Sequence, residues 1–267
     1  MQFKSCISTR LFITGLLALF SHSSVAAELA KSNTPSDGRF SMSFGVNYDT
    51  GDYGASIDTD VWTTPIGLNY RNGLWSFGLS TSWLYVTSPN SVNADGEFIG
   101  GGGERTKERG MGDTSLSVTY DLLDDRDYFV GLDISARVKF ATADEDKFLG
   151  SGKTDYSVNA EAYKVINNWT PYWNLGYRWK GDPSDIDYNN VWSTALGFDY
   201  QINRDLILGA EYFWQQKITR FSENAKELTV NANYYVNDTN KLNFYLLTGF
   251  GNASPNWGSG VTLVHYF

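Results

Sequence analysis

The chain has 267 residues with a formal net charge of −9, and 16% of the residues are aromatic. This length fits a single domain, the aromatic and glycine content favours an all-β fold, and the acidic charge argues against nucleic acid as a partner. One cysteine excludes a disulfide framework, and two histidines offer little for a zinc or haem site, so we expect neither a metal nor a cofactor.

Residues 1–26 are typical of a cleaved secretory signal peptide. Basic Lys4 and Arg10 lie before a short apolar run at 11–20, and small residues follow at 24–26. A run of about ten apolar residues is too short to span a bilayer as a helix. We therefore expect export of the chain and cleavage after the small residues, which leaves a mature protein with one histidine and no cysteine.

From residue 39 onward the hydrophobic period is two. Phe40, Met42, Phe44, Val46 and Tyr48 are apolar, and the residues between them are small or polar. Such alternation predicts a strand with one face in an apolar medium and the other in a polar one. The pattern occurs twelve times, and the predicted strands are 40–48, 62–70, 75–85, 114–120, 130–140, 156–162, 173–179, 192–200, 206–214, 228–236, 242–250 and 261–267.

The connections between these strands alternate in length. Short turns are predicted at 71–73, 121–127, 166–170, 203–205 and 237–240, and longer polar loops at 49–56, 87–109, 143–153, 181–190, 215–225 and 251–257. This alternation is typical of a transmembrane up-and-down antiparallel β-barrel of the outer-membrane type, with short turns in the periplasm and long loops outside. We expect about 12 strands in a barrel at 39–267, preceded by a periplasmic segment at 27–38.

Aromatic residues cluster at the ends of the predicted strands, where amphipathic rings prefer the bilayer interface. An inner belt would contain Tyr70, Trp75, Tyr120, Trp173, Tyr200 and Phe267, and an outer belt Tyr48, Trp62, Tyr85, Phe140, Trp179, Trp192, Trp214 and Trp257. The opposite strand face is polar, which suits a wet lumen better than the core of a soluble barrel. The terminal Phe267 is similar to the signal read by barrel-insertion machinery. That machinery, outer-membrane lipid and lipopolysaccharide are therefore expected partners.

Catalysis has little support in the sequence. A barrel of this size can be a lipid hydrolase with a Ser–His pair, but the candidate base is His265, which we interpret as an interfacial residue. The acidic run at 144–146 is best interpreted as a solvated loop, with a calcium or lipopolysaccharide-bridging site as the alternative. The glycine run at 100–103 is not followed by a helix, so it does not predict a phosphate site. The loop at 87–109 either narrows the mouth or stays outside.

The candidate site is the lumen. Counted by parity along the strands, the inward charged residues are Asp133, Arg137, Lys139, Asp155, Glu161, Arg178, Lys180 and Glu211. Their mixed signs favour either cross-strand ion pairs that hold a narrow lumen or a constriction that selects anionic solutes. Tyr163, Phe213, Tyr235, Tyr245 and Leu247 also face inward by parity, which suits an amphipathic or aromatic solute. Twelve strands predict a narrow channel.

Five segments from residue 110 onward carry recognisable motifs. They are Gly112-Asp113-Thr114-Ser115-Leu116, Lys139-Phe140-Ala141-Thr142-Ala143-Asp144, Gly150-Ser151-Gly152-Lys153-Thr154-Asp155-Tyr156, Asn174-Leu175-Gly176-Tyr177 and Ala253-Ser254-Pro255-Asn256-Trp257-Gly258. On these segments the chain resembles the outer-membrane family of the MetA pathway of phenol degradation, a group of proposed transporters. Members usually carry Pro-Thr-Gly-Asp where this chain has Ala-Thr-Ala-Asp at 141–144. The resemblance implies a barrel that imports small hydrophobic or aromatic compounds.

The sequence therefore predicts an outer-membrane channel for passive uptake of small solutes, with no enzymatic activity. Two alternatives stay open. One is a structural or adhesive barrel whose lumen is plugged by side chains or by residues 27–37. The other is a surface lipid hydrolase that depends on His265.

Overall fold

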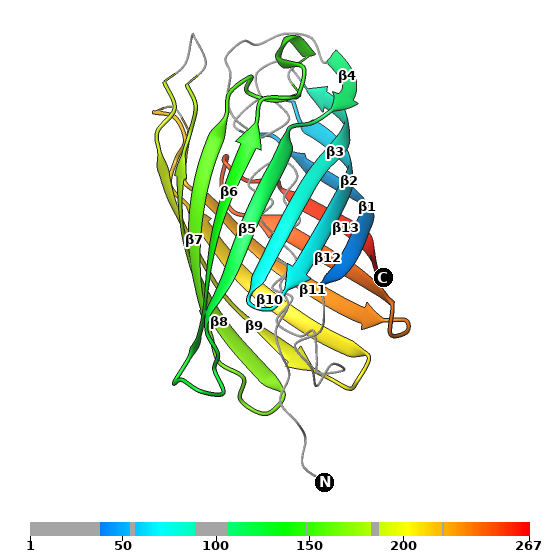
Figure 1. The fold of residues 1–267 in the computed structure, drawn as a ribbon. Coiled ribbons are helices and arrows are strands. Elements are labelled where there is room, and N and C mark those ends of the chain that lie inside the picture. Colours follow the sequence, from blue (N-terminus) through cyan, green and yellow to red (C-terminus); the bar gives the residue numbers. More distant parts are fainter. Residues whose placement is uncertain (1–37, 54–56, 89–105, 148, 183–186, 221) are drawn as a thin grey trace.

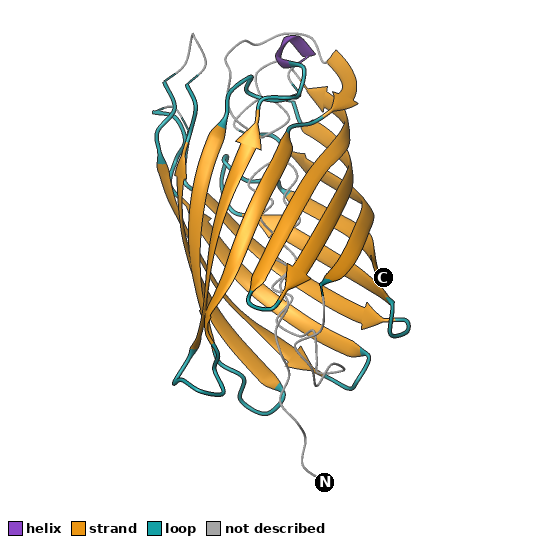
Figure 2. Cartoon of the chain, in the orientation of Figure 1, coloured by secondary structure: helices purple, strands orange, loops and turns teal. Residues whose placement is uncertain are grey.

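The computed structural model describes residues 38–53, 57–88, 106–147, 149–182, 187–220 and 222–267, which form an antiparallel β-barrel (Figures 1 and 2). Its strands are β1 Arg39–Gly51, β2 Thr59–Asn72, β3 Trp75–Ser88, β4 Thr106–Met111, β5 Thr114–Leu123, β6 Gly131–Phe140, β7 Asp155–Tyr163, β8 Trp169–Trp179, β9 Val191–Gln201, β10 Leu206–Gln215, β11 Ala225–Tyr235, β12 Asn240–Gly249 and β13 Trp257–Tyr266. One 3₁₀ turn, η1 (Glu145–Lys147), lies in the β6–β7 loop. No helix among the described residues is long and apolar enough to cross a membrane.

Twelve strands close the barrel, as the sequence predicts. Each pairs antiparallel with its neighbours, and β1 pairs with both β2 and β13, which joins the two ends of the sheet. The thirteenth strand, β4, adds nothing to the circumference, because it pairs with the outer half of β3 while β5 pairs with the inner half. β4 and β5 therefore act as one interrupted strand.

The prediction of a loop over 87–109 is wrong at both of its ends. β3 continues to Ser88 and β4 begins at Thr106, so the hairpin extends beyond the predicted strand ends. β4 was missed because its sequence, TKERGM, has no alternating apolar face. Backbone pairing alone extends this hairpin. Residues 89–105, which include the glycine run, lie outside the described residues, as do the predicted signal peptide and residues 27–37.

A bulge at Asp113 separates β4 from β5. Trp83 is opposite Met111 and Ser80 is opposite Ser115, so the β4–β5 side contains one residue more than β3. Such a bulge bends the strand and redirects a side chain. Here the redirected carboxylate of Asp113 reaches the β6–β7 loop and accepts hydrogen bonds from the amides of Thr142 and Ala143 at 3.0 and 2.9 Å.

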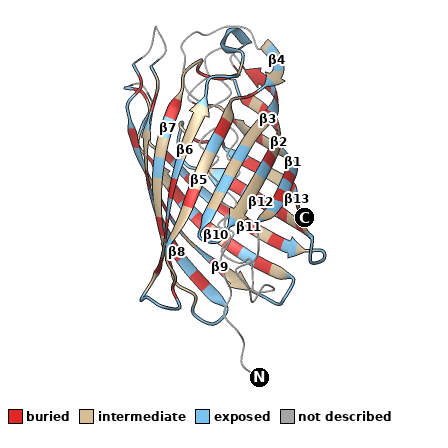
Figure 3. Cartoon of the chain, viewed as in Figure 1, coloured by how far each residue is buried: buried red, intermediate tan, exposed pale blue. Residues whose placement is uncertain are grey.

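Buried and exposed residues alternate along almost every strand (Figure 3). The exposed set is apolar and includes Phe44, Trp62, Leu196 and Leu246. Aromatic rings from neighbouring strands contact each other at both ends of the barrel. Their centroids are 4.6 Å apart for Trp75–Tyr120 and for Trp169–Tyr200 at the end with short turns, 4.9 Å for Tyr48–Trp62 and 4.7 Å for Tyr177–Trp192 at the end with long loops. The apolar outer face and its aromatic ends match the requirements of a bilayer.

The inner face is polar and closely packed on the β11–β12 side. Asn233 donates to Asn231 and accepts from Asn243, both at 3.1 Å. Lys241 is 1% exposed, with its Nζ 5.9 Å from the ring centre of Tyr235. These interlocked side chains narrow the lumen from this side.

Candidate functional site in the lumen

The outer end of the lumen, on the side of the long loops, carries a cluster of paired charges. Lys139 donates to the Asp113 carboxylate at 2.6 Å, and its Nζ lies 3.6 Å from the carboxylate of Asp155. Lys180 donates to Asp155 at 2.9 Å, and its Nζ lies 5.3 Å from the ring centre of Tyr188. Both lysines are therefore neutralised locally, and Asp155 links β7 to the ends of β6 and β8.

Arg137 and Arg178 lie in one row of the wall. Each is the register partner of Ser157, Arg137 on β6 and Arg178 on β8. With strands about 4.8 Å apart, their Cα atoms are separated by about 10 Å, and their positive charges repel each other. Arg137 is half-buried, and its Nε donates to no acceptor within the described part of the chain. The two guanidinium side chains therefore lie on one part of the inner wall.

The remaining predicted site residues lie nearer the end with short turns, except Glu211. Asp133 on β6 is directly opposite Glu161 on β7, and both are buried. This juxtaposition of two acids differs from the alternating signs expected of a simple ladder of cross-strand ion pairs, because like charges in register repel. Glu211, near the middle of β10, accepts a hydrogen bond from the Tyr172 hydroxyl at 3.0 Å.

The sequence analysis predicted that Tyr245 and Leu247 face inward, but it missed the apolar cluster that they join at the outer mouth. Tyr53, from the β1–β2 loop, and Leu149, from the β6–β7 loop, are 6% and 1% exposed. They pack with one another and with inward residues of three strands; the other members are Val61, Leu84, Val86, Tyr245 and Leu247. We call these seven residues the mouth cluster. The sequence carried one signal for this cluster: Leu149 is an apolar residue within a mostly polar loop.

Two buried carboxylates, Asp49 on β1 and Glu227 on β11, lie at the same end and were also missed. They are 0% and 1% exposed, and none of their four oxygens accepts a hydrogen bond of good geometry within the described residues. Burial raises the pKa of the Tyr53 phenol well above its usual value, and the negative charges of Asp49 and Glu227 raise it further. Tyr53 therefore lies within electrostatic range of both carboxylates.

Two other features that the sequence singles out are His265 and the acidic run at 144–146. His265 Nδ1 lies 2.9 Å from Asn240 Oδ1, and its ring meets that of Phe267 edge-on. Asp144 is exposed and pairs with Lys147 at 2.8 Å, which lowers the pKa of this carboxyl. Among the residues that the structure describes, no three His, Cys, Asp or Glu side chains are grouped to hold a metal.

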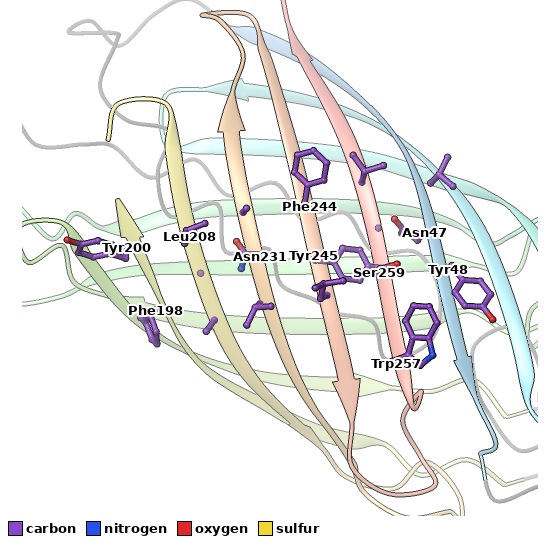
Figure 4. Close-up of a pocket in the computed structure, with 18 of the residues that line it drawn as sticks. Asn47, Tyr48, Phe198, Tyr200, Leu208, Asn231, Phe244, Tyr245, Trp257 and Ser259 are labelled. Carbon is purple, nitrogen blue, oxygen red and sulfur yellow. The ribbon is translucent and has the colours of Figure 1, made fainter. Parts of the chain in front are cut away.

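A separate apolar hollow of about 1130 Å³ lies on the wall formed by β8–β13, β1 and β2 (Figure 4). Most of its lining side chains belong to the apolar outer face, among them Leu208, Phe244 and Trp257. Asn231 and Tyr245, which are buried on the inner face, also border it.

The family described as "Putative MetA-pathway of phenol degradation" matches residues 50–267. The chain belongs to this family. Four of the five motif segments lie at strand ends or in loops, where they form the Asp113 bulge, the Lys139–Asp155 pair and the loop before β13, and the fifth, 174–177, lies within β8. No curated protein matches the chain significantly.

Solved structures show the same fold. The COG4313 outer membrane channel from Pseudomonas putida F1 is 15% identical, with a TM-score of 0.63 over 90% of this chain and 100% of that one. The NanC porin (14% identity, TM-score 0.55) covers 85% of this chain and 99% of its own, and the KdgM porin (12%, 0.52) covers 84% and 99%. At these identities the likeness establishes the architecture of this family member.

Proposed function

We propose that this family member is an outer-membrane channel through which small solutes diffuse passively, with aromatic or amphipathic compounds favoured. The observation that carries the proposal is the combination of an apolar outer face with a charged inner face in a closed barrel. Charged residues facing inward are costly unless they are paired with one another or contact water or solute. Family membership and the fold shared with outer-membrane channels support it.

The Arg137–Arg178 row is the proposed selectivity element. Two guanidinium groups on one patch of the wall attract a carboxylate or phenolate and offer planar donors to it. The buried rings of Tyr163 and Phe213 line other parts of the inner face. An anionic compound with an aromatic body satisfies both kinds of surface. Passage needs no cofactor, because the solute moves down its own gradient.

Export and insertion are part of the same proposal. Residues 1–26 act as the cleaved signal peptide, and the barrel resides in the outer membrane in contact with lipid and lipopolysaccharide. Phe267 continues the terminal ladder, since its amide donates to the Phe40 carbonyl at 3.0 Å. Its exposed ring is available to the insertion machinery.

Conductance of the refolded barrel in a planar bilayer tests the function. We expect a steady, narrow pore in the wild type and a several-fold lower anion-to-cation permeability ratio in the double variant Arg137→Ala, Arg178→Ala. Arg126→Ala is the matched control, because Arg126 lies in the β5–β6 turn and is paired with Asp124. An unchanged ratio in the double variant contradicts the selectivity role.

The mouth cluster favours a second candidate, a structural barrel with a plugged lumen. Its loop residues Tyr53 and Leu149 pack against strand side chains within the mouth. A correctly folded barrel that conducts no ions under any condition, including after truncation of these two side chains, would support this candidate and contradict the channel.

A further inference from the structure

The carboxylates of Asp49 and Glu227 are buried at the outer mouth, and none of their oxygens has a hydrogen-bond partner of good geometry within the described residues. The phenol oxygen of Tyr53 also has no such partner there. Tyr53 is 94% buried and lies within electrostatic range of both acids. A buried carboxylate without a partner destabilises a fold. A proton or a bound cation would remove this cost.

The backbone around the two acids is arranged to bring them inward. A Cβ atom at Gly258 would lie 2.0 Å from Asp49 Oδ1, so the carboxylate occupies the space that a side chain would fill. Gly249, the register partner of Glu227, lies under the β12–β13 loop, where a Cβ would meet the Pro255 carbonyl oxygen at 2.3 Å. The β12–β13 loop therefore packs closely against β12, and Ser254 of this loop is 1% exposed.

Protonation of Asp49 and Glu227 does not by itself give every buried oxygen of these two residues a hydrogen-bond partner. The Ser254 hydroxyl is within hydrogen-bonding reach of Glu227. The two oxygens of Asp49 have no hydrogen-bond partner in the described part of the chain, so protonation of Asp49 would leave its O–H group unpaired. A buried donor without an acceptor retains most of its desolvation cost. A metal cation, in contrast, neutralises the charge and contacts all the unpartnered oxygens at once.

We propose that Asp49 and Glu227, with oxygens of Tyr53 and Ser254, form a divalent-cation site at the outer mouth. All the donors are oxygens, which hard cations such as Ca²⁺ prefer, and two carboxylates balance one divalent charge. The Ser254 hydroxyl accepts from the Lys226 amide at 3.0 Å and lies close to Glu227. This site is independent of the transport proposal, because it concerns ion binding rather than solute flux.

The site also connects two loops to the wall. Tyr53 belongs to the mouth cluster, and Ser254 belongs to the loop that the Asn256 amide anchors to the Thr50 carbonyl at 2.7 Å. A bound cation contacts both loops and both strands. Loading the site therefore stabilises the closed mouth, and removing the ion leaves two repelling carboxylates beneath it.

Calorimetric titration of CaCl₂ into the EDTA-treated, refolded barrel tests the site. We expect about one Ca²⁺ per barrel in the wild type and at least tenfold weaker binding in Asp49→Asn, Glu227→Gln. The matched control removes the exposed loop acids, Asp144→Asn, Asp146→Asn, and retains wild-type binding. Absence of binding in the wild type, or loss of binding in the loop variant alone, overturns the proposal.

A second measurement needs no variant and covers the case in which the double substitution prevents folding. The unfolding temperature of the wild-type barrel is compared in EDTA, in CaCl₂ at pH 7.5, and in EDTA at pH 5. At a Ca²⁺ concentration about 100 times the dissociation constant, we expect an increase of about 5–10 °C. If the unfolding temperature does not increase with Ca²⁺, no cation fills the site and the proposal is overturned. If pH 5 alone produces the same increase, protons fill the site and the proposal is also overturned.

Discussion

Asp113 shows how a single bulged residue organises a loop. Its carboxylate accepts from the amides of Thr142 and Ala143 and pairs with Lys139. The family usually carries Pro-Thr-Gly-Asp at 141–144, and this chain has Ala-Thr-Ala-Asp. The contacts use the backbone amides of the second and third positions, which neither change removes. The attachment of this loop to the wall therefore does not depend on which side chains stand at positions 141 and 143.

Gly249 makes a prediction at the residue scale. Gly249→Ala places a Cβ within 2.3 Å of the Pro255 carbonyl oxygen, so the β12–β13 loop must move. We expect a loss of about 1–3 kcal/mol in the free energy of unfolding in urea, by overpacking. Gly67→Ala is the control, because its Cβ meets only the rotatable hydroxyl of Ser43 closely. Equal losses in the two variants would contradict a specific role of the contact with the Pro255 carbonyl oxygen.

At the scale of elements, the loops do more than connect strands. The β1–β2 and β6–β7 loops send Tyr53 and Leu149 into the mouth cluster, and the β12–β13 loop folds over Gly249. β3 and β4 extend the wall beyond the predicted strand ends. The outer end is therefore a packed structure with its own small core rather than a ring of solvated loops.

Truncating the mouth cluster is expected to open the barrel. The double variant Tyr53→Ala, Leu149→Ala removes the two loop side chains from the cluster, so we expect a several-fold larger single-channel conductance in a planar bilayer. Leu122→Ala, on the exposed side of β5 at the opposite end, is the control and retains the wild-type conductance. An unchanged conductance in the double variant would place the narrowest point of the lumen elsewhere.

At the scale of the whole molecule, closure depends on the pairing of the first strand with the last. β1 and β13 pair over ten residues, from Ser41–Tyr266 to Thr50–Trp257. The twelve strands of the ring are closed in this way, which meets the requirement for a sheet in a bilayer. Among the described strands, β4 at the outer end is paired along one edge, with β3. The C-terminal strand therefore completes the barrel.

Deletion of Phe267 tests whether this residue is needed for folding of the barrel itself or for its insertion by the cellular machinery. It removes one ladder hydrogen bond, worth about 1 kcal/mol, so the purified variant should still refold to a heat-modifiable barrel on a gel. In cells, we expect a several-fold lower amount of assembled barrel in the outer membrane, because the terminal aromatic is lost. The control is Phe267→Tyr, which keeps the chain length and the terminal aromatic residue. Equal assembly of the deletion variant and the wild type would contradict the proposed interaction with the insertion machinery.

The sequence by itself determined the pattern of strands, the closure of the barrel by twelve of them, and which face of each strand is apolar and which is polar. These follow from local rules, because alternation with period two assigns each side chain to a face wherever the strand pairs. The aromatic pairs at both ends of the barrel, such as Trp75–Tyr120 and Tyr48–Trp62, follow from the same parity.

Only the tertiary structure decided what meets inside the barrel. Parity placed Asp133 and Glu161 in the lumen, but register made them direct neighbours. The bulge at Asp113, the charged strand β4, the mouth cluster and the Asp49–Glu227 pair depend on contacts between loops and strands far apart in the chain. Periodicity carries no information about such contacts, because they are fixed by register, curvature and the space that glycines leave.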